Sequence, residues 1–165
     1  MVCFKIYGYL LTVDSLMHLR IQLIDKGGYK ESLEKILENA IKKCTKNNTK
    51  YHYMSKLAGL YLEMGKYAQA LGLFKKCSEY LEKNKTIFAN YEKMKQWPLR
   101  SIIIATYYAG DKDEAIRKAK DYLITYPEDL TIKSIAEGSI DETKKGVILD
   151  EIIDDIPYDN LYIFP

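Results

Sequence analysis

Few residues in this chain of 165 could carry out chemistry. Its two histidines are His18 and His52, and only His18 has a carboxylate at helical spacing, Asp14 four residues earlier. Two such side chains on one helix face could share a metal ion, but no third ligand accompanies them, so we favour a surface ion pair. Phosphate-binding glycine loops, nucleophile elbows and HExxH zinc motifs do not occur in the sequence. We therefore expect a non-enzymatic protein with no metal and no cofactor.

The cysteines and the charge pattern limit the remaining classes. Cys3, Cys44 and Cys77 lie 41 and 33 residues apart, a spacing that suits neither a disulfide framework nor a zinc knuckle. We expect reduced thiols and a cytoplasmic location. The net charge is +2 and no basic stripe with interleaved aromatics is present, so nucleic acid is not an expected partner. No apolar run approaches the roughly 18 residues that a membrane span needs.

Three glycine-centred segments indicate an internal repeat that would position the remaining side chains. Gly27, Gly65 and Gly110 lie 38 and 45 residues apart, and periods of this length are typical of stacked supersecondary units. Apolar residues around each glycine recur at intervals of three and four, as on one face of a helix. Each unit is predicted to be a helix, a glycine turn and a second helix. The predicted units span residues 13–46, 51–84 and 96–129.

The middle unit gives the clearest helical pattern. The stripe predicted for its first helix is Met54, Leu57, Ala58, Tyr61 and Leu62, and that for its second is Tyr67, Ala70, Leu71, Phe74, Cys77 and Leu81.

In the third unit, Asp111 and Glu114 predict a capping box, and Pro127 is expected to end the second helix. Trp97-Pro98 is expected to restart the chain as a helix, because proline suits a first helical turn. The extra length near residues 85–96 either prolongs the preceding helix or forms a short one of its own.

These units resemble the tetratricopeptide (TPR) repeat family. In the middle unit Leu57-Ala58, Tyr61, Ala70 and Phe74 stand at the positions of its L-G, Y and A-x3-F pattern, and in the third unit Ala115, Ala119 and Pro127 stand at the A, F and P positions. The resemblance implies an all-α fold: a TPR-like right-handed superhelix of about three helix-turn-helix repeats with terminal capping helices, over residues 1–139. The lengthened period is similar to that of peptide-sensing TPR-like domains of bacterial regulators.

The resemblance also implies a concave groove lined by the first helix of each unit. Its aromatic and arginine side chains have the composition of a binding hot spot. A chaperone C-terminus is not an expected ligand, because only Lys56 matches the carboxylate clamp of the chaperone-binding TPR domains. The predicted groove residues are His18, His52, Lys56, Trp97, Arg100, Ile104, Tyr107 and Tyr108.

Elements outside the repeats are predicted to cap the stack. Phe4, Tyr7 and Leu11 could cap one end. At the other, residues 130–136 are predicted to form a short helix that ends at Gly138, and residues 147–156 a further apolar segment. Residues 140–165 carry seven acids and two lysines, and we expect this acidic, aromatic segment to be a cap or a docking tail.

The expected function is a scaffold that binds a peptide or protein segment in the groove. One alternative is a self-assembly module, a possible homodimer, in which residues 150–164 of the same or a neighbouring chain fill the groove. The other is the sensor part of a peptide-regulated transcription factor.

Overall fold

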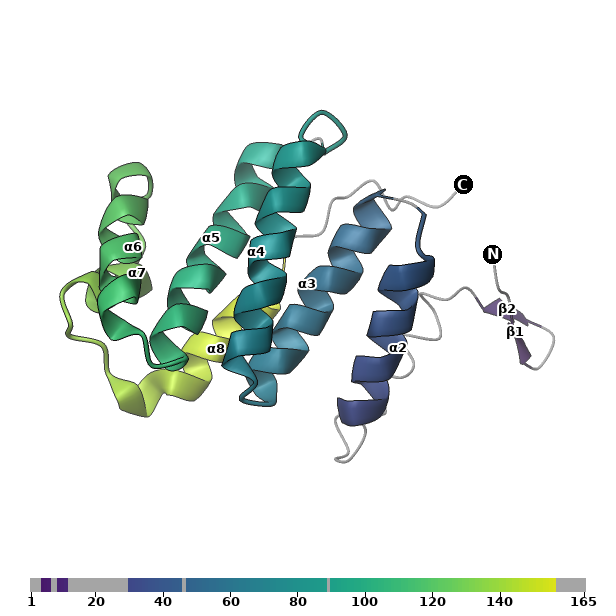
Figure 1. Ribbon diagram of the computed structural model, residues 1–165, viewed down its shortest axis with the longest axis horizontal. Helices are drawn as coiled ribbons and strands as arrows, with labels where there is room; N and C mark the ends of the chain where they lie inside the picture. The colour runs from purple at the N-terminus through teal and green to yellow at the C-terminus, as the bar shows by residue number, and fades with distance from the viewer. Residues whose placement is uncertain (1–3, 7–8, 12–29, 46, 89, 157–165) are drawn as a thin grey trace. The chain divides into compact units, whose positions relative to one another are not determined.

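The structure is a computed structural model that describes residues 4–6, 9–11, 30–45, 47–88 and 90–156 (Figure 1). The chain divides into two compact units, residues 1–36 and 37–165.

In the first unit, β1 (Phe4–Ile6) pairs antiparallel with β2 (Tyr9–Leu11), so that Phe4 lies opposite Leu11. A helical cap was expected at this end, and these residues are strands instead. Aromatic and β-branched residues favour extended backbone, and so short a segment cannot form a stable helix alone. The predicted helix before Gly27 lies outside the described residues, and α2 (Lys30–Lys43) begins in this unit.

The second unit consists of helices and turns in its described part, which agrees with the all-α prediction. After α2 come α3 (Asn47–Glu63), α4 (Tyr67–Lys83), α5 (Tyr91–Tyr108), α6 (Lys112–Thr125), α7 (Leu130–Ala136), the 3-10 helix η1 (Glu142–Lys144) and α8 (Lys145–Asp154). Figure 1 shows α3 and α4 as neighbours, followed by α5 and α6, with α8 crossing behind them.

Glycines end three of these helices in the same way. Gly65, Gly110 and Gly138 have φ angles of 69°, 100° and 66°, in the left-handed region that side chains with a Cβ avoid. At the first turn, the N–H of Lys66 donates to the carbonyl of Tyr61 and that of Gly65 to the carbonyl of Leu62. The same pair of bonds closes the other two turns, and each is a Schellman motif. The turns at Gly65 and Gly110 reverse the chain within three residues.

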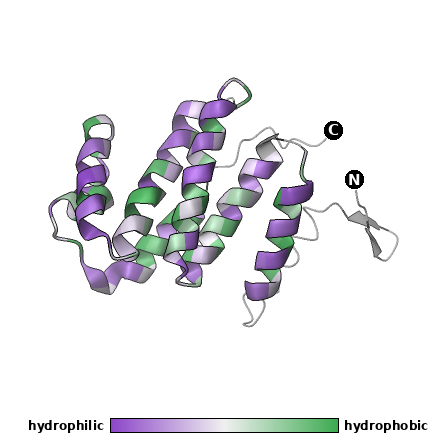
Figure 2. Ribbon diagram, in the orientation of Figure 1, coloured by the Kyte–Doolittle hydropathy of each residue, from purple (hydrophilic) through white to green (hydrophobic). Residues whose placement is uncertain are grey.

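The predicted apolar stripes form the core between these helices. All five predicted residues of α3 are buried, and so are Ala70, Phe74, Cys77 and Leu81 of α4. Figure 2 shows hydrophobic positions alternating with hydrophilic ones along α3, α4 and α5. Tyr67 and Leu71 are only half-buried, because they lie at the margin of the stripe that α4 turns to its neighbours.

Helix α5 differs from the prediction at Pro98. The chain does not restart at Trp97, because α5 runs unbroken from Tyr91 to Tyr108 and contains Pro98 in its eighth position. Proline there removes the N–H that would bond the carbonyl of Met94. Pro98 is fully buried, so packing compensates for the lost bond. The extra length of this repeat is thus a turn after Lys83 followed by an N-terminal extension of α5, and neither expected form occurs.

The C-terminal elements agree with the prediction. Helix α7 has the bounds expected for it, with Asp129 as its N-cap and Gly138 after its end. The apolar segment predicted at residues 147–156 is largely α8, and Ile148, Leu149 and Ile152 are its buried residues.

Candidate functional site

The predicted groove residues that the structure describes come from two helices. His52 and Lys56 lie on α3, where both are half-buried, and the other five lie on α5. His18 and its neighbour Asp14 lie outside the described residues. We call the surface formed by Gly59 of α3 and by Trp97, Arg100, Tyr107 and Tyr108 of α5 the α3–α5 face.

The α3–α5 face is covered by the chain's own C-terminal segment, residues 142–156, which comprises η1, α8 and the residues up to Ile156. The indole Nε1 of Trp97 donates a hydrogen bond of 2.8 Å to the backbone carbonyl of Ile152. Both residues are buried. A side chain of α5 therefore satisfies a carbonyl near the end of α8, one of the groups that a helix cannot satisfy internally.

Helix α3 meets the C-terminal segment at Gly59. A Cβ placed there would lie 3.5 Å from Cγ1 of Ile153 and 3.6 Å from Cδ1 of Ile156. These are ordinary van der Waals distances, so a methyl group would fit and a larger side chain would push the segment away. The segment can therefore stay at its present distance from α3 only with a residue no larger than alanine at this position.

Arg100 of α5 forms an ion pair with Glu151 of the C-terminal segment. Its Nη2 donates to Oε2 of Glu151 at 2.8 Å, and its Nε donates to Oδ2 of Asp129 at 3.0 Å. Burial lowers the pKa of Arg100, but the hydrogen bond to Glu151 and the charges of both carboxylates outweigh burial and raise it. The guanidinium is therefore charged at every pH of interest. Its third nitrogen, Nη1, is buried without a hydrogen-bond partner among the residues described.

Two more interactions hold the start of the segment. Oε1 of Glu142 accepts a hydrogen bond of 2.7 Å from the Tyr107 hydroxyl and one of 3.1 Å from Lys112 Nζ. These two bonds lower the pKa of the Glu142 carboxyl below its ordinary 4.5. A carboxylate at this position is thus favoured over a neutral acid.

Lys145 lies over two tyrosine rings. Its Nζ is 4.8 Å from the ring centroid of Tyr67 and 4.9 Å from that of Tyr108. Tyr107 stands perpendicular to Tyr108, with ring centroids 5.3 Å apart. Burial, followed by the charge of Glu142, raises the pKa of Tyr108 to about 12, so the Tyr108 ring faces the ammonium group as a neutral phenol. Such an arrangement attracts a cation through the ring quadrupoles.

Sequence analysis did not identify the residues that face this surface. Tyr67 was assigned to a packing stripe, and Glu142, Lys145 and Glu151 were counted only as charges of an acidic tail. A signal was present: the buried positions 148, 149 and 152 of α8 are spaced as one helical face, with the charged residues beside them.

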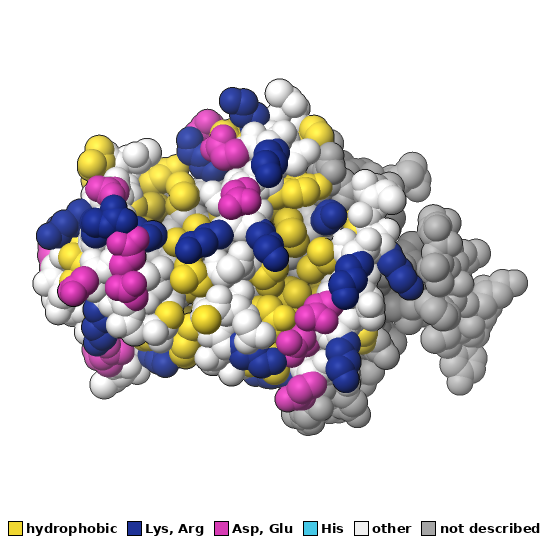
Figure 3. Space-filling model, viewed as in Figure 1, with side chains coloured by type: hydrophobic (Ala, Val, Ile, Leu, Met, Phe, Trp, Pro, Cys, Tyr) yellow, Lys and Arg dark blue, Asp and Glu magenta, His cyan; other side chains and the backbone are white. Residues whose placement is uncertain are grey.

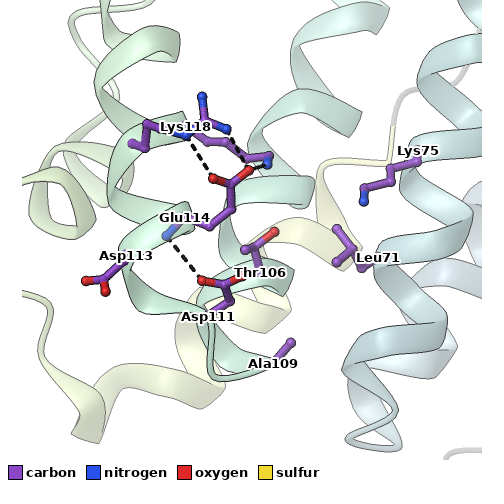
Figure 4. Close-up of a pocket in the computed structure, with 9 residues that line it drawn as sticks. Leu71, Lys75, Thr106, Ala109, Asp111, Asp113, Glu114 and Lys118 are labelled. Carbon is purple, nitrogen blue, oxygen red and sulfur yellow. Dashed lines mark hydrogen bonds and ion pairs between the residues drawn. The ribbon is translucent and has the colours of Figure 1, made fainter.

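A hollow lies between α4 and α6 (Figure 4). It measures about 590 Å³ and is lined by Leu71 and Lys75 of α4, together with residues around the start of α6. Glu114 is already paired with Arg117 and Lys118, so the charges at this hollow largely compensate each other. On the face shown in Figure 3, acidic and basic side chains are likewise interspersed, with hydrophobic ones between them.

Comparisons with family models, with curated proteins and with solved structures give no match to this chain. Within the described ranges, no three His, Cys, Asp or Glu side chains form a group that could hold a metal ion. Nor is any helix in that part of the chain long and apolar enough to cross a bilayer.

Proposed function

We propose that the protein is a non-enzymatic, TPR-like scaffold that binds a helical segment of a partner protein on the α3–α5 face. The main support for the proposal is that residues 142–156, which include the helix α8, bind to this face. Hydrogen bonds, ion pairs and cation–π contacts all join side chains of α4, α5 and α6 to this one segment. A surface that recognises one helix in so many ways has the chemistry to bind another.

The local architecture supports the TPR-like part of the proposal. Two successive helix pairs, α3–α4 and α5–α6, are each joined by a Schellman turn at the glycine of the repeat. The first helices of the two pairs, α3 and α5, together supply the face, as the resemblance implies. Within this proposal the protein works in the cytoplasm, where Cys44 and Cys77, which form no disulfide in the described part of the chain, would stay reduced.

The connection to the C-terminal segment supports a self-assembly module as the second candidate. Only residues 137–141 link α7 to η1, and most of them are exposed. Exchange of the segment between two chains would preserve every contact described above. Light scattering distinguishes the two candidates, because exchange gives a dimer, whereas the scaffold is a monomer in the absence of its partner.

The test uses the full chain with Ile152→Asp, which places a charge in the buried contact and should release the segment. Trp97 is the only tryptophan, so its emission should shift to longer wavelength while the helical circular dichroism is largely kept. A synthetic peptide of residues 140–156 should then bind and restore the emission, and the same peptide with Ile152→Asp should not. A folded, released variant that binds no peptide would contradict the proposal.

If Ile152→Asp prevents folding, the unaltered chain gives the same information. Excess peptide should accelerate hydrogen exchange in residues 145–154 of the protein and leave the amides of α5 protected. Unchanged exchange at saturating peptide would contradict the proposal equally.

A further inference from the structure

We propose that the partner of the α3–α5 face is an amphipathic helix of another protein that carries the anchor pattern of residues 142–156. That pattern is an acid, a lysine three residues later, a second acid six residues after the lysine, and an aliphatic stripe on the same side. The inference rests on the proposed function and adds to it the sequence and the direction of the bound helix.

The aliphatic stripe supplies the contact area. Ile148, Leu149 and Ile152 are buried, whereas Val147 on the opposite side is 60% exposed. Ile152 lies four residues after Ile148 and three after Leu149, so these three positions form one side of the helix. A partner helix therefore needs aliphatic residues at these places and tolerates polar residues elsewhere. Ile156, two residues after the end of α8, is also buried, so the apolar contact extends beyond the helix.

The polar anchors fix the order of charges. The first acid meets Tyr107 and Lys112, the lysine meets the rings of Tyr67 and Tyr108, and the second acid meets Arg100. Reversal of any one of these charges places like charges together, or sets an anion against the negative faces of the rings. The three anchors thus select a sequence, whereas an apolar groove alone would accept many helices.

The anchors also fix the direction of the helix. Going from residue 142 to residue 152 along the segment, the contacts on α5 pass from Tyr107 and Tyr108 to Arg100 and then to Trp97. The bound helix is therefore antiparallel to α5. A helix of the opposite direction could keep the apolar stripe but would place its charges at the wrong anchors.

Another protein fits this face better than a second copy of the chain. The five-residue connection at residues 137–141 keeps the chain's own segment at high local concentration. A second copy brings the identical segment and gains no new contact. A different helix can gain one, because Nη1 of Arg100 is buried and has no hydrogen-bond partner in the described part of the chain. An additional carboxylate or carbonyl oxygen there would favour the partner over the tethered segment.

The experiment measures fluorescence anisotropy of labelled peptides of residues 140–156 with the full chain carrying Ile152→Asp. Peptides with Lys145→Glu or Glu151→Lys should bind about tenfold more weakly than the unaltered peptide. A peptide with Val147→Ala, changed on the exposed side, should bind within about twofold of it. Introducing Arg100→Gln into the protein should remove most of the difference in affinity between the unaltered peptide and the Glu151→Lys peptide, because the neutral side chain no longer distinguishes the two charges.

Each contrary result has a distinct meaning. Equal binding of the charge-reversed and unaltered peptides would overturn the anchor pattern and leave the proposed function standing. Failure of every peptide to bind the folded variant would refute the proposed function itself. A concentration-dependent dimer of the unaltered chain in sedimentation would make a second copy the occupant and overturn the inference. If Ile152→Asp does not fold, the same peptides can be added to the unaltered chain. The acceleration of hydrogen exchange in residues 145–154 of the protein then ranks the affinities of the peptides.

Discussion

Trp97 links the core of the protein to its candidate site at the scale of single residues. Its indole and the Phe74 ring pack edge to face, with ring centroids 5.3 Å apart, and its Nε1 donates a hydrogen bond to the carbonyl of Ile152. The side chain is 5% exposed because the C-terminal segment covers it. Any release of the segment should therefore change the fluorescence of Trp97.

Glu142 should make the docking of the segment sensitive to acid. Its pKa is lowered in the folded state, so its contribution to stability is complete above its ordinary 4.5 and is lost as the pH falls through the lower folded value. The unaltered chain should exceed Glu142→Gln in free energy of unfolding at pH 7. That difference should vanish on acidification below 4.5. Urea unfolding of both proteins across the pH range measures it, and a difference that grows below pH 4.5 would refute the assignment.

Ala70 tests the packing of the middle helix pair. It is fully buried on α4, whereas Ala68 of the same helix is exposed. Ala70→Glu forces an unpaired carboxylate between two close helices and should cost about 3 kcal/mol or more. The matched control Ala68→Glu should stay within about 0.5 kcal/mol of the unaltered chain. Thermal melting followed by circular dichroism measures both, and equal melting temperatures for the two variants would disprove the packing.

At the scale of elements, the turn between α5 and α6 limits how the start of α6 can be capped. At the start of α6, Asp111 accepts a hydrogen bond from the N–H of Glu114, as predicted, but the reciprocal half of the capping box is missing. The N–H of Asp111 already donates to the carbonyl of Thr106 in the preceding glycine turn. Glu114 turns instead to Arg117 and Lys118. Because only three residues separate α5 from α6, the N–H of Asp111 cannot both close the turn that ends α5 and donate to the Glu114 side chain as a capping box requires.

Substitutions at two glycines test whether a glycine turn depends on its backbone conformation or on the space around it. Beyond the adjacent backbone, no atom lies within 4 Å of where a Cβ would stand at Gly65 or Gly72, but only Gly65 has a positive φ, of 69°. Gly65→Ala should destabilise the protein by about 1 kcal/mol, and Gly72→Ala inside α4 should stabilise it by roughly 0.5–1 kcal/mol. Chemical denaturation of the two variants measures the contrast. Equal effects of the two changes would mean that the turn does not depend on the left-handed conformation.

Local sequence predicted most elements of the second unit. Glycine turns, stripes at intervals of three and four, and the bounds of α7 all follow from interactions within a few residues. Pro98 was misassigned because proline is compatible both with a first helical turn and with a helix interior whose packing compensates for the lost bond. The two short strands at the N-terminal end were missed since residues 4–11 are too few to show a periodicity.

The candidate site was predictable only in part, because it depends on contacts across the whole molecule. The residues of α5 are predicted as site residues from their types and from the resemblance. Their partners lie 35 to 55 residues further along the chain, as the separations of the Tyr107–Glu142 and Trp97–Ile152 pairs show. Helical periodicity contains no information on which acid meets which base over such separations. The sequence offered residues 150–164 as an occupant of the groove only as an alternative, and it did not indicate that residues 142–156 contact the α3–α5 face or through which side chains.

The central claim is that residues 142–156 form a separable helix on the α3–α5 face and not an integral part of the core. Native-state hydrogen exchange of the unaltered chain tests it most directly, because it gives an opening free energy for each helix. We predict that the amides of α8 exchange through an opening of lower free energy than those of α5, while α3 and α5 stay protected. Exchange of α8 only through the global unfolding that also exposes α5 would contradict the account.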